Sequence, residues 1–273
     1  MRPLRATLRL ALLLALVLAL FPLALATRAL AACGAERAAL RAAARVQRAW
    51  ARATLWGMGV RIDAGAARWP QLAGGLLVCN HVSWLDIPVL AACAPLRFVA
   101  KGEIAHWPLF GWMSRSVGTL FIARGRARDV ATVQRELAAS IESGVFPLVF
   151  PEGRATDGRA VRAFHAGLLE IAPRGGWPCF AFGLRYPDPP REPGAAATFA
   201  WHDGTPLWVH VWRVLGERRI DVRVRCSGPH APLARRELAR ALEREVAALA
   251  GVPVEGAGAD GAGNAFPAAE ATR

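Results

Sequence analysis

The first pattern along the chain is an uncharged apolar run that follows an arginine-rich start. Three arginines within the first nine residues precede this run, which covers residues 10–27 and ends at Arg28. As a helix these residues would rise about 27 Å, close to the thickness of the hydrocarbon core of a bilayer. We therefore predict a membrane anchor or a re-entrant helix over residues 1–30, kinked or shortened at Pro22.

A cleaved signal peptide is the alternative interpretation of the same residues. The Ala-Leu-Ala sequence at residues 24–26 resembles a cleavage site after a basic start and an apolar stretch. The length of the run favours an uncleaved anchor, because the apolar regions of signal peptides are usually shorter. Arginines flank both ends of the run, so the positive-inside rule does not fix its orientation.

A second helix is predicted over residues 36–56, where arginines recur every three or four residues. These arginines are Arg37, Arg41, Arg45, Arg48 and Arg52. Small and apolar residues lie between them, so the helix would be amphipathic. One interpretation is a solvated helix face, and the other is a helix lying on lipid headgroups, which the neighbouring apolar run favours. We assign residues 31–56 to this basic amphipathic helix.

Short apolar runs alternate with helical patterns from residue 57 to residue 251. The runs predicted as strands cover residues 76–79, 98–100, 119–122, 146–150, 179–184 and 219–226. Apolar residues at helical spacing predict helices over residues 129–143 and 233–249. This alternation predicts one α/β domain over residues 57–251, a mixed sheet flanked by helices. Residues 252–273 lack periodicity, which predicts a disordered tail.

Composition narrows the class of protein. The chain has 273 residues, of which 54% are hydrophobic, so it is too apolar for a disordered protein. The net charge is +13 and Lys101 is the only lysine. Such a charge suits an anionic membrane, a nucleic acid or an acidic substrate. The arginines form no dense runs and there is no nucleic-acid-binding signature, so we predict no nucleic-acid partner. The five scattered cysteines favour neither a disulfide scaffold nor a metal site.

The sharpest candidate for chemistry follows the first apolar strand of the domain. Residues 80–86 read Asn-His-Val-Ser-Trp-Leu-Asp. On a straight helix His81 and Asp86 would lie on different faces, but at a strand-to-helix turn the two side chains can meet. The carboxylate would then hold the imidazole in one tautomer and stabilise its protonated form. The alternative is a buried histidine beside a capping aspartate.

Two other segments place polar residues directly after apolar strands. Arg124 ends one strand, where its guanidinium can bind a phosphate or carboxylate through two hydrogen bonds. Glu152 and Gly153 follow another strand, and there the carboxylate can accept hydrogen bonds while the glycine allows close backbone approach. The alternatives are a surface arginine and an ordinary turn.

In this order and spacing, the three segments resemble the motifs of the glycerolipid acyltransferase family. The resemblance covers about residues 57–227. The Asn-His-x4-Asp motif corresponds to residues 80–86, Gly-x-x-Phe-x-x-Arg to residues 118–124, and Phe-Pro-Glu-Gly to residues 150–153. The chain departs from the family after residue 153 and lacks the proline expected in the strand at residues 179–184. Residues 84–88 and 98–101 resemble the bacterial lyso-ornithine lipid acyltransferase branch most.

The resemblance implies a membrane-bound O-acyltransferase that moves a fatty acyl chain to the hydroxyl of a lyso-lipid, either lyso-ornithine lipid or lysophosphatidic acid. It implies that His81 is the general base and that Asp86 orients it. It also implies that Arg124, Glu152 and Gly153 bind the acceptor. Attack on the donor would be direct, without an acyl-enzyme.

The resemblance further implies that the acyl donor is a thioester of acyl carrier protein or of coenzyme A, and that no metal or redox cofactor takes part. The expected location is the bacterial inner membrane, with the active site facing the cytoplasm. Three alternatives stay open: an enzyme specific to 1-acyl-glycerol-3-phosphate, a non-catalytic basic membrane-binding protein, and a secreted enzyme if residues 10–27 are cleaved.

Overall fold

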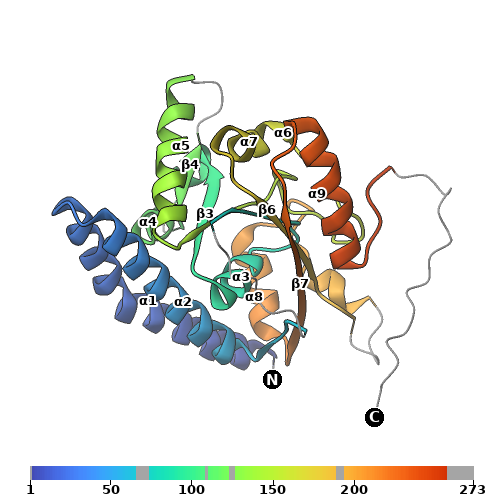
Figure 1. Cartoon of the computed structure of the whole chain (residues 1–273). Helices are drawn as coiled ribbons and strands as arrows, with labels where there is room; N and C mark the ends of the chain where they lie inside the picture. Colours follow the sequence, from blue (N-terminus) through green and yellow to red (C-terminus); the bar gives the residue numbers. More distant parts are fainter. Residues whose placement is uncertain (1, 66–73, 108–109, 123–126, 189–193, 257–273) are drawn as a thin grey trace, which may run out of the picture.

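The computed structural model describes residues 2–65, 74–107, 110–122, 127–188 and 194–256. Its centre is a seven-stranded sheet in the order β1-β7-β6-β2-β5-β3-β4 (Figure 1). The strands are β1 (Val60–Asp63), β2 (Leu76–Cys79), β3 (Leu96–Lys101), β4 (Leu120–Ile122), β5 (Phe146–Val149), β6 (Cys179–Arg185) and β7 (Ile220–His230). Only β6 and β7 pair antiparallel, and the other neighbours are parallel. The predicted mixed sheet flanked by helices is confirmed.

The central strands are buried on both faces, which explains why they are continuous apolar runs rather than alternating patterns. In β2, Leu77 and Cys79 join one core cluster, and Leu76 and Val78 join another. The first cluster is covered by α2 (Glu36–Met58), α3 (Asp86–Cys93) and α8 (Leu207–Gly216), and the second by α6 (Ala166–Leu169) and α9 (Arg235–Ala250). The sheet therefore separates two helical layers (Figure 1).

The remaining helices cover the β4 edge and the loops. They are η1 (Gly102–His106), α4 (Phe110–Ser116), α5 (Ala127–Glu142), α7 (Ile171–Gly175) and η2 (Ala195–Thr198). Val133 and Leu137 of α5 pack with Leu120 of β4 in a third, smaller cluster. The α5 helix overlaps the one predicted over residues 129–143.

The apolar N-terminal run forms α1 (Arg2–Ala32), a helix of 31 residues. The helix continues through Pro22, so it is not shortened at this residue, and the predicted kink stays a prediction. The α1 and α2 helices pack side by side as a hairpin along one side of the molecule (Figure 1). They approach so closely at Gly57 that an added Cβ atom would lie 2.1 Å from Cδ2 of Leu12. A larger residue at position 57 would therefore require the Leu12 side chain to move.

The α1 helix contacts the α/β domain near its start and again in its second half. Arg5 Nη1 donates to the carbonyl of Gly216, at 2.8 Å, where α8 ends. Arg9 donates through Nη1 to the preceding carbonyl of α8 at 3.0 Å, and the same nitrogen also contacts the carbonyl of Glu217. Further along, the ring of Phe21 lies 3.7 Å from that of Trp112 in α4, centroid to centroid. The helix therefore packs along the domain.

The arginines of α2 do not all face outward, as the predicted lipid-facing helix requires. Arg48 Nη2 donates to the carbonyl of Cys93 at 3.1 Å, and both Arg48 and Arg52 donate to the carbonyl of Ala92. These carbonyls end α3 and have no partner within their own helix. Arg37 pairs with Glu142 of α5. Part of the basic face therefore makes contacts within the protein, and contact of the remaining arginines with lipid headgroups stays a prediction.

The domain continues past the boundary that the sequence predicted at residue 251. The N–H of Val161 donates to the carbonyl of Pro253 at 2.9 Å, and the N–H of Glu255 donates to the carbonyl of Val161 at 2.8 Å. Val252 and Val254 also pack against the core cluster beneath α9. Residues 252–255 therefore belong to the folded domain.

Candidate active site

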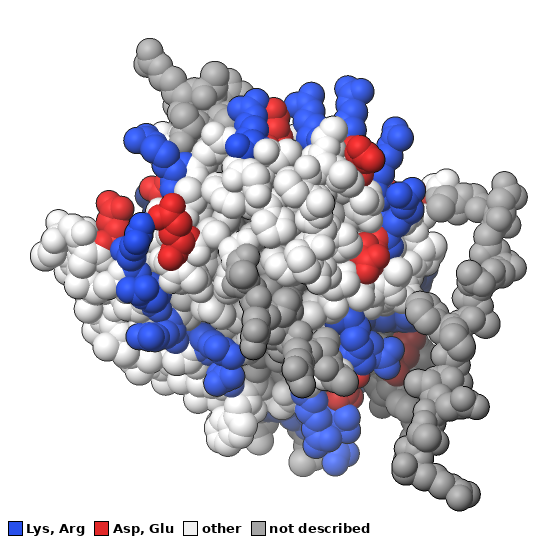
Figure 2. Space-filling view, viewed as in Figure 1, with Lys and Arg blue, Asp and Glu red and all other residues white. Residues whose placement is uncertain are grey.

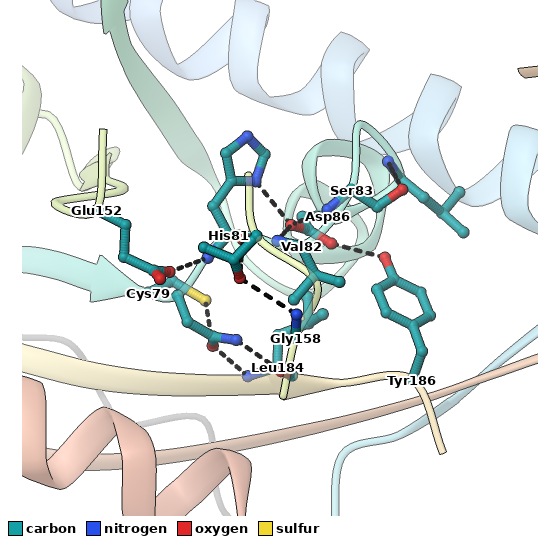
Figure 3. Close-up of polar contacts among 12 residues, drawn as sticks. Cys79, His81, Val82, Ser83, Asp86, Glu152, Gly158, Leu184 and Tyr186 are labelled. Atoms are coloured by element: carbon teal, nitrogen blue, oxygen red, sulfur yellow. Dashed lines mark hydrogen bonds and ion pairs between the residues drawn. The ribbon is translucent and has the colours of Figure 1, made fainter. Parts of the chain in front are cut away.

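The turn between β2 and α3 brings His81 and Asp86 together. The strand ends at Cys79 and the helix begins at Asp86, as the strand-to-helix interpretation requires. Nδ1 of His81 lies 2.7 Å from Oδ2 of Asp86 (Figure 3). A carboxylate oxygen accepts, so Nδ1 carries the proton and Nε2 presents its lone pair. The geometry needed for a general base is present, and the catalytic role stays a prediction.

The Asp86 carboxylate is completely buried, yet four donors surround it. Oδ2 accepts the bond from His81 and also the backbone N–H groups of Val82 at 2.7 Å and Ser83 at 2.9 Å. Oδ1 accepts the hydroxyl of Tyr186 at 2.7 Å (Figure 3). These donors satisfy a group whose burial would otherwise be costly. The carboxylate is thus fixed in one orientation.

The imidazole ring of His81 is the exposed end of this network. About 20% of the side chain is exposed, whereas Asp86 is inaccessible. The ring stacks on Phe150, with centroids 4.3 Å apart. Nε2 has no hydrogen-bond partner among the residues that the structure describes. This nitrogen is therefore free to accept a proton from a hydroxyl group that lies in the plane of the ring, in line with its lone pair.

Glu152 is buried, and its carboxylate points toward the backbone of the His81 turn (Figure 3). Oε1 accepts the backbone N–H of His81 at 2.7 Å, and Oε2 accepts that of Arg162 at 2.9 Å. The residue is buried, and this burial raises the pKa of its carboxyl to about 7. Each oxygen accepts one backbone N–H, which gives Glu152 a supporting position under the turn, and its role in acceptor binding stays a prediction.

The other two predicted binding residues differ in what the structure says of them. Gly153 adopts a φ of +73°, a conformation that favours glycine, and its N–H donates to the carbonyl of Phe150 at 3.0 Å. A Cβ atom here would lie 3.0 Å from Cδ2 of His165. The role of Gly153 in acceptor binding stays a prediction. Arg124 lies outside the described residues, so its role also stays a prediction.

Residues from distant segments hold the His81 turn in place, and the sequence analysis did not find these contacts. The amide of Asn80 donates to the carbonyl of Leu184 at 2.8 Å and accepts its N–H at 2.8 Å. On the other side, Thr156 N–H donates to the carbonyl of His81 at 2.9 Å. Such contacts join residues far apart in the chain, and no local pattern signals them.

A second set of contacts reaches the turn from α8 and the loop before it. The N–H of Trp201 donates to the carbonyl of Val82 at 2.9 Å. The indole of Trp84 donates to Nδ1 of His210 at 3.0 Å, and Nε2 of His210 lies 3.0 Å from the carbonyl of Ala200. Burial lowers the pKa of His210, which suits a neutral ring that accepts at Nδ1. The turn is therefore supported from both sides.

Comparison with known proteins gives consistent results. A family model described as Acyltransferase matches residues 63–184. The chain is 38% identical over 191 residues to the lyso-ornithine lipid O-acyltransferase of Pseudomonas aeruginosa, which covers 68% of this chain and 70% of that protein. It is 34% identical over 167 residues to the 1-acyl-sn-glycerol-3-phosphate acyltransferase of Neisseria meningitidis, covering 61% of this chain and 64% of that protein.

The fold is also similar to a solved structure. The crystal structure of the 1-acyl-sn-glycerophosphate (LPA) acyltransferase PlsC from Thermotoga maritima superposes with a TM-score of 0.57. The superposition covers 91% of this chain and 98% of the other, at 18% sequence identity. At that identity the likeness concerns the fold alone.

Proposed function

Because the chain belongs to the glycerolipid acyltransferase family and is an acyltransferase, we propose that it transfers a fatty acyl chain to the hydroxyl of a lyso-lipid. The observation that carries this proposal is the arrangement of His81. Asp86 holds Nδ1, while Nε2 has no partner in the described part of the chain and faces the open side of the turn. A neutral imidazole in this tautomer is suited to deprotonate an alcohol.

The proposed reaction needs no protein nucleophile. Nε2 of His81 accepts the proton of the lyso-lipid hydroxyl while the oxygen attacks the carbonyl carbon of an acyl thioester. The new C–O ester bond forms, the C–S bond breaks, and the departing thiolate takes the proton from His81. Asp86 stabilises the transient imidazolium. Ser83, the hydroxyl nearest in sequence, is fully buried, which argues against an acyl-enzyme on this residue.

For the acceptor we propose lyso-ornithine lipid first and lysophosphatidic acid second. The first choice is supported by the higher identity and wider coverage of the Pseudomonas relative, whose name states that activity. Arg124 is the proposed ligand for the acceptor headgroup. For the donor we propose acyl carrier protein or coenzyme A thioesters. Basic side chains outnumber acidic ones on the face shown in Figure 2, which suits an acidic carrier or a polyanionic cofactor.

We also propose that the enzyme is attached to a membrane by α1 lying in the bilayer interface. The helix is apolar and long enough to cross a membrane, and only 11% of its most apolar window is buried. Its exposed leucines are Leu4, Leu8, Leu14, Leu18, Leu23, Leu25 and Leu30. The contacts of Arg5 and Phe21 with the domain favour a helix that lies along the surface rather than one that spans. The proposed location is the cytoplasmic side of the bacterial inner membrane.

The membrane proposal is tested by washing and by substitution. The wild-type enzyme should stay with lipid vesicles in high salt, because burial of apolar surface is not screened by ions. A Leu14→Arg and Leu18→Arg double variant, altered one helical turn apart on the exposed side, should be released by salt and still fold. Release of the wild type by salt alone would refute the proposal.

The acceptor and donor are tested in one panel. The purified full-length enzyme is given labelled acyl carrier protein or coenzyme A thioester together with lyso-ornithine lipid or lysophosphatidic acid. We expect an ester product on lyso-ornithine lipid at the highest kcat/KM. A higher kcat/KM for lysophosphatidic acid would reverse the order of acceptors. No ester with any pair would refute the proposed function.

A further inference from the structure

Tyr186, which follows β6 and lies outside all three sequence motifs, contacts the catalytic pair. We propose that Tyr186 is a positioning residue: its hydroxyl holds the Asp86 carboxylate toward His81 and sets how strongly His81 binds its proton. The inference rests on the proposed function, because it takes His81 to be the general base. It goes further by assigning a residue 100 positions away from Asp86 to the same network.

The two oxygens of the Asp86 carboxylate have different partners. Oδ2 accepts from His81 and from two backbone N–H groups, whereas Oδ1 accepts from Tyr186 alone among the described residues. Asp86 and Tyr186 are both buried, so no bulk water reaches Oδ1 to donate a hydrogen bond in place of the phenol. If the hydroxyl were absent, Oδ1 would be left without a donor in a closed site. The phenol therefore fixes which oxygen faces the imidazole.

The fold brings Tyr186 to this position through Asn80. The side-chain amide of Asn80 makes two hydrogen bonds with the backbone of Leu184 and so locks the end of β6 to the residue before His81. Tyr186 lies two residues beyond Leu184, and its ring packs against Phe199, with centroids 5.6 Å apart. The two Asn80 hydrogen bonds therefore fix both the His81 turn and the position of the Tyr186 hydroxyl.

The hydrogen bond also has an electrostatic consequence. A donor to Oδ1 draws negative charge toward itself, so the carboxylate attracts the protonated imidazole less. Without the hydroxyl, the carboxylate would stabilise the imidazolium more strongly and His81 would hold its proton to a higher pH. A stronger donor would have the opposite effect. The proton affinity of His81 should therefore follow the strength of this one hydrogen bond.

Other titratable groups face the pair and must be separated from it. Cys79 is fully buried, which raises the pKa of its thiol well above the usual value and keeps it neutral. Glu152 binds the backbone of His81, and burial raises its pKa to about 7, inside the range where a histidine titrates. His210 reaches the turn only through Trp84. The test must therefore distinguish His81 from Glu152.

Tyr186 is the only tyrosine in the chain, so global replacement of tyrosine changes this residue alone. We compare the wild-type enzyme with Tyr186→Phe and with protein grown on 3-fluorotyrosine, whose more acidic phenol is a stronger donor. The measurement is the pH dependence of kcat/KM in lipid micelles. The acid limb should move up by about 0.5 to 1 pH unit in Tyr186→Phe and down in the fluorinated enzyme. We expect kcat to fall about three- to tenfold in Tyr186→Phe with little change in KM.

Two controls identify the cause of the shift. Phe199→Leu loosens the packing beside Tyr186 without removing its hydroxyl, so its acid limb should stay in place. The ¹⁹F resonance of the fluorinated Tyr186 should titrate with His81, persist in Glu152→Gln and stop titrating in His81→Ala. The inference would be overturned if the acid limbs of Tyr186→Phe and of the fluorinated enzyme did not move in opposite directions. It would also be overturned if the acid limb of Phe199→Leu moved as far as that of Tyr186→Phe. Full activity in His81→Ala would instead overturn the proposed function.

Discussion

Two buried carboxylates flank His81, and the protein uses them differently. Asp86 contacts the imidazole ring and receives four hydrogen bonds, two of them from side chains. Among the described residues, the Glu152 carboxylate accepts hydrogen bonds from the backbone of His81 and from that of Arg162. Burial outweighs these two bonds, so the pKa of Glu152 rises to about 7. The two carboxylates of the motifs thus support the site through different contacts, one through the imidazole ring and the other through the backbone.

The largest effect should come from removing the charge next to the ring. Asp86→Asn keeps the shape of the side chain, but an amide neither favours the imidazolium nor holds its tautomer. Because Asp86 acts through His81, we expect kcat/KM to fall nearly as far as in His81→Ala, by about 10²- to 10⁴-fold. Acyl-transfer kinetics measure this, with circular dichroism as the control for folding. A loss below about tenfold would place Asp86 among the structural residues.

Substitutions at Arg124 and Glu152 should have smaller effects, and each should change a different kinetic constant. Arg124→Ala should raise KM for the lyso-lipid about tenfold or more and leave KM for the thioester unchanged, because a charge-assisted contact is lost. Arg124→Lys should restore only part of it, since lysine lacks the planar fork. Glu152→Gln should lower kcat rather than raise KM for the acceptor. A tenfold higher KM for the acceptor in Glu152→Gln would show that Glu152 binds the acceptor.

The smallest effect concerns stability and pH. The pKa of Glu152 is about 7 in the folded protein, against 4.5 for an unperturbed glutamate, so the folded state binds the proton more tightly between these values. The stability from this group is therefore full below about pH 4.5 and is lost as the pH rises through about 7. Its slope is at most about 1.4 kcal/mol per pH unit. The free energy of unfolding, measured by thermal unfolding at several pH values, should fall more steeply with pH in the wild type than in Glu152→Gln. Parallel plots of this free energy against pH would contradict the raised pKa of Glu152.

The parts of the fold that could be predicted are those with a local signal. Strands such as β2 and β5 are buried on both faces and form short apolar runs, and the turn after β2 is marked by the apolar run ending at Cys79. By contrast, β1 has only two apolar residues in four, and its pairing with β7 depends on residues 160 positions away. Propensity is weak over such short stretches, so tertiary pairing decides them.

The candidate site divides in the same way. The meeting of His81 and Asp86 follows from five residues of local spacing at a strand-to-helix turn. The contacts of Tyr186 with Asp86 and of Glu152 with Arg162 could not be predicted in this way. Each joins residues at least ten positions apart in the chain, which only the folded sheet brings together. For the same reason the sequence could not show that Glu152 is buried, since an acidic residue after a strand has the same local pattern whether it points outward or inward.

The central claim is that His81 acts as a general base on the acceptor hydroxyl with no acyl-enzyme. The most direct measurement is acyl transfer by His81→Ala beside wild type and Ser83→Ala, with each protein also quenched after the donor alone and examined by mass spectrometry. We expect activity in His81→Ala to fall about 10²- to 10⁴-fold with folding intact, most activity to remain in Ser83→Ala, and no protein to carry an acyl group. Wild-type turnover in His81→Ala, or a covalent acyl adduct on the wild-type enzyme, would contradict the account.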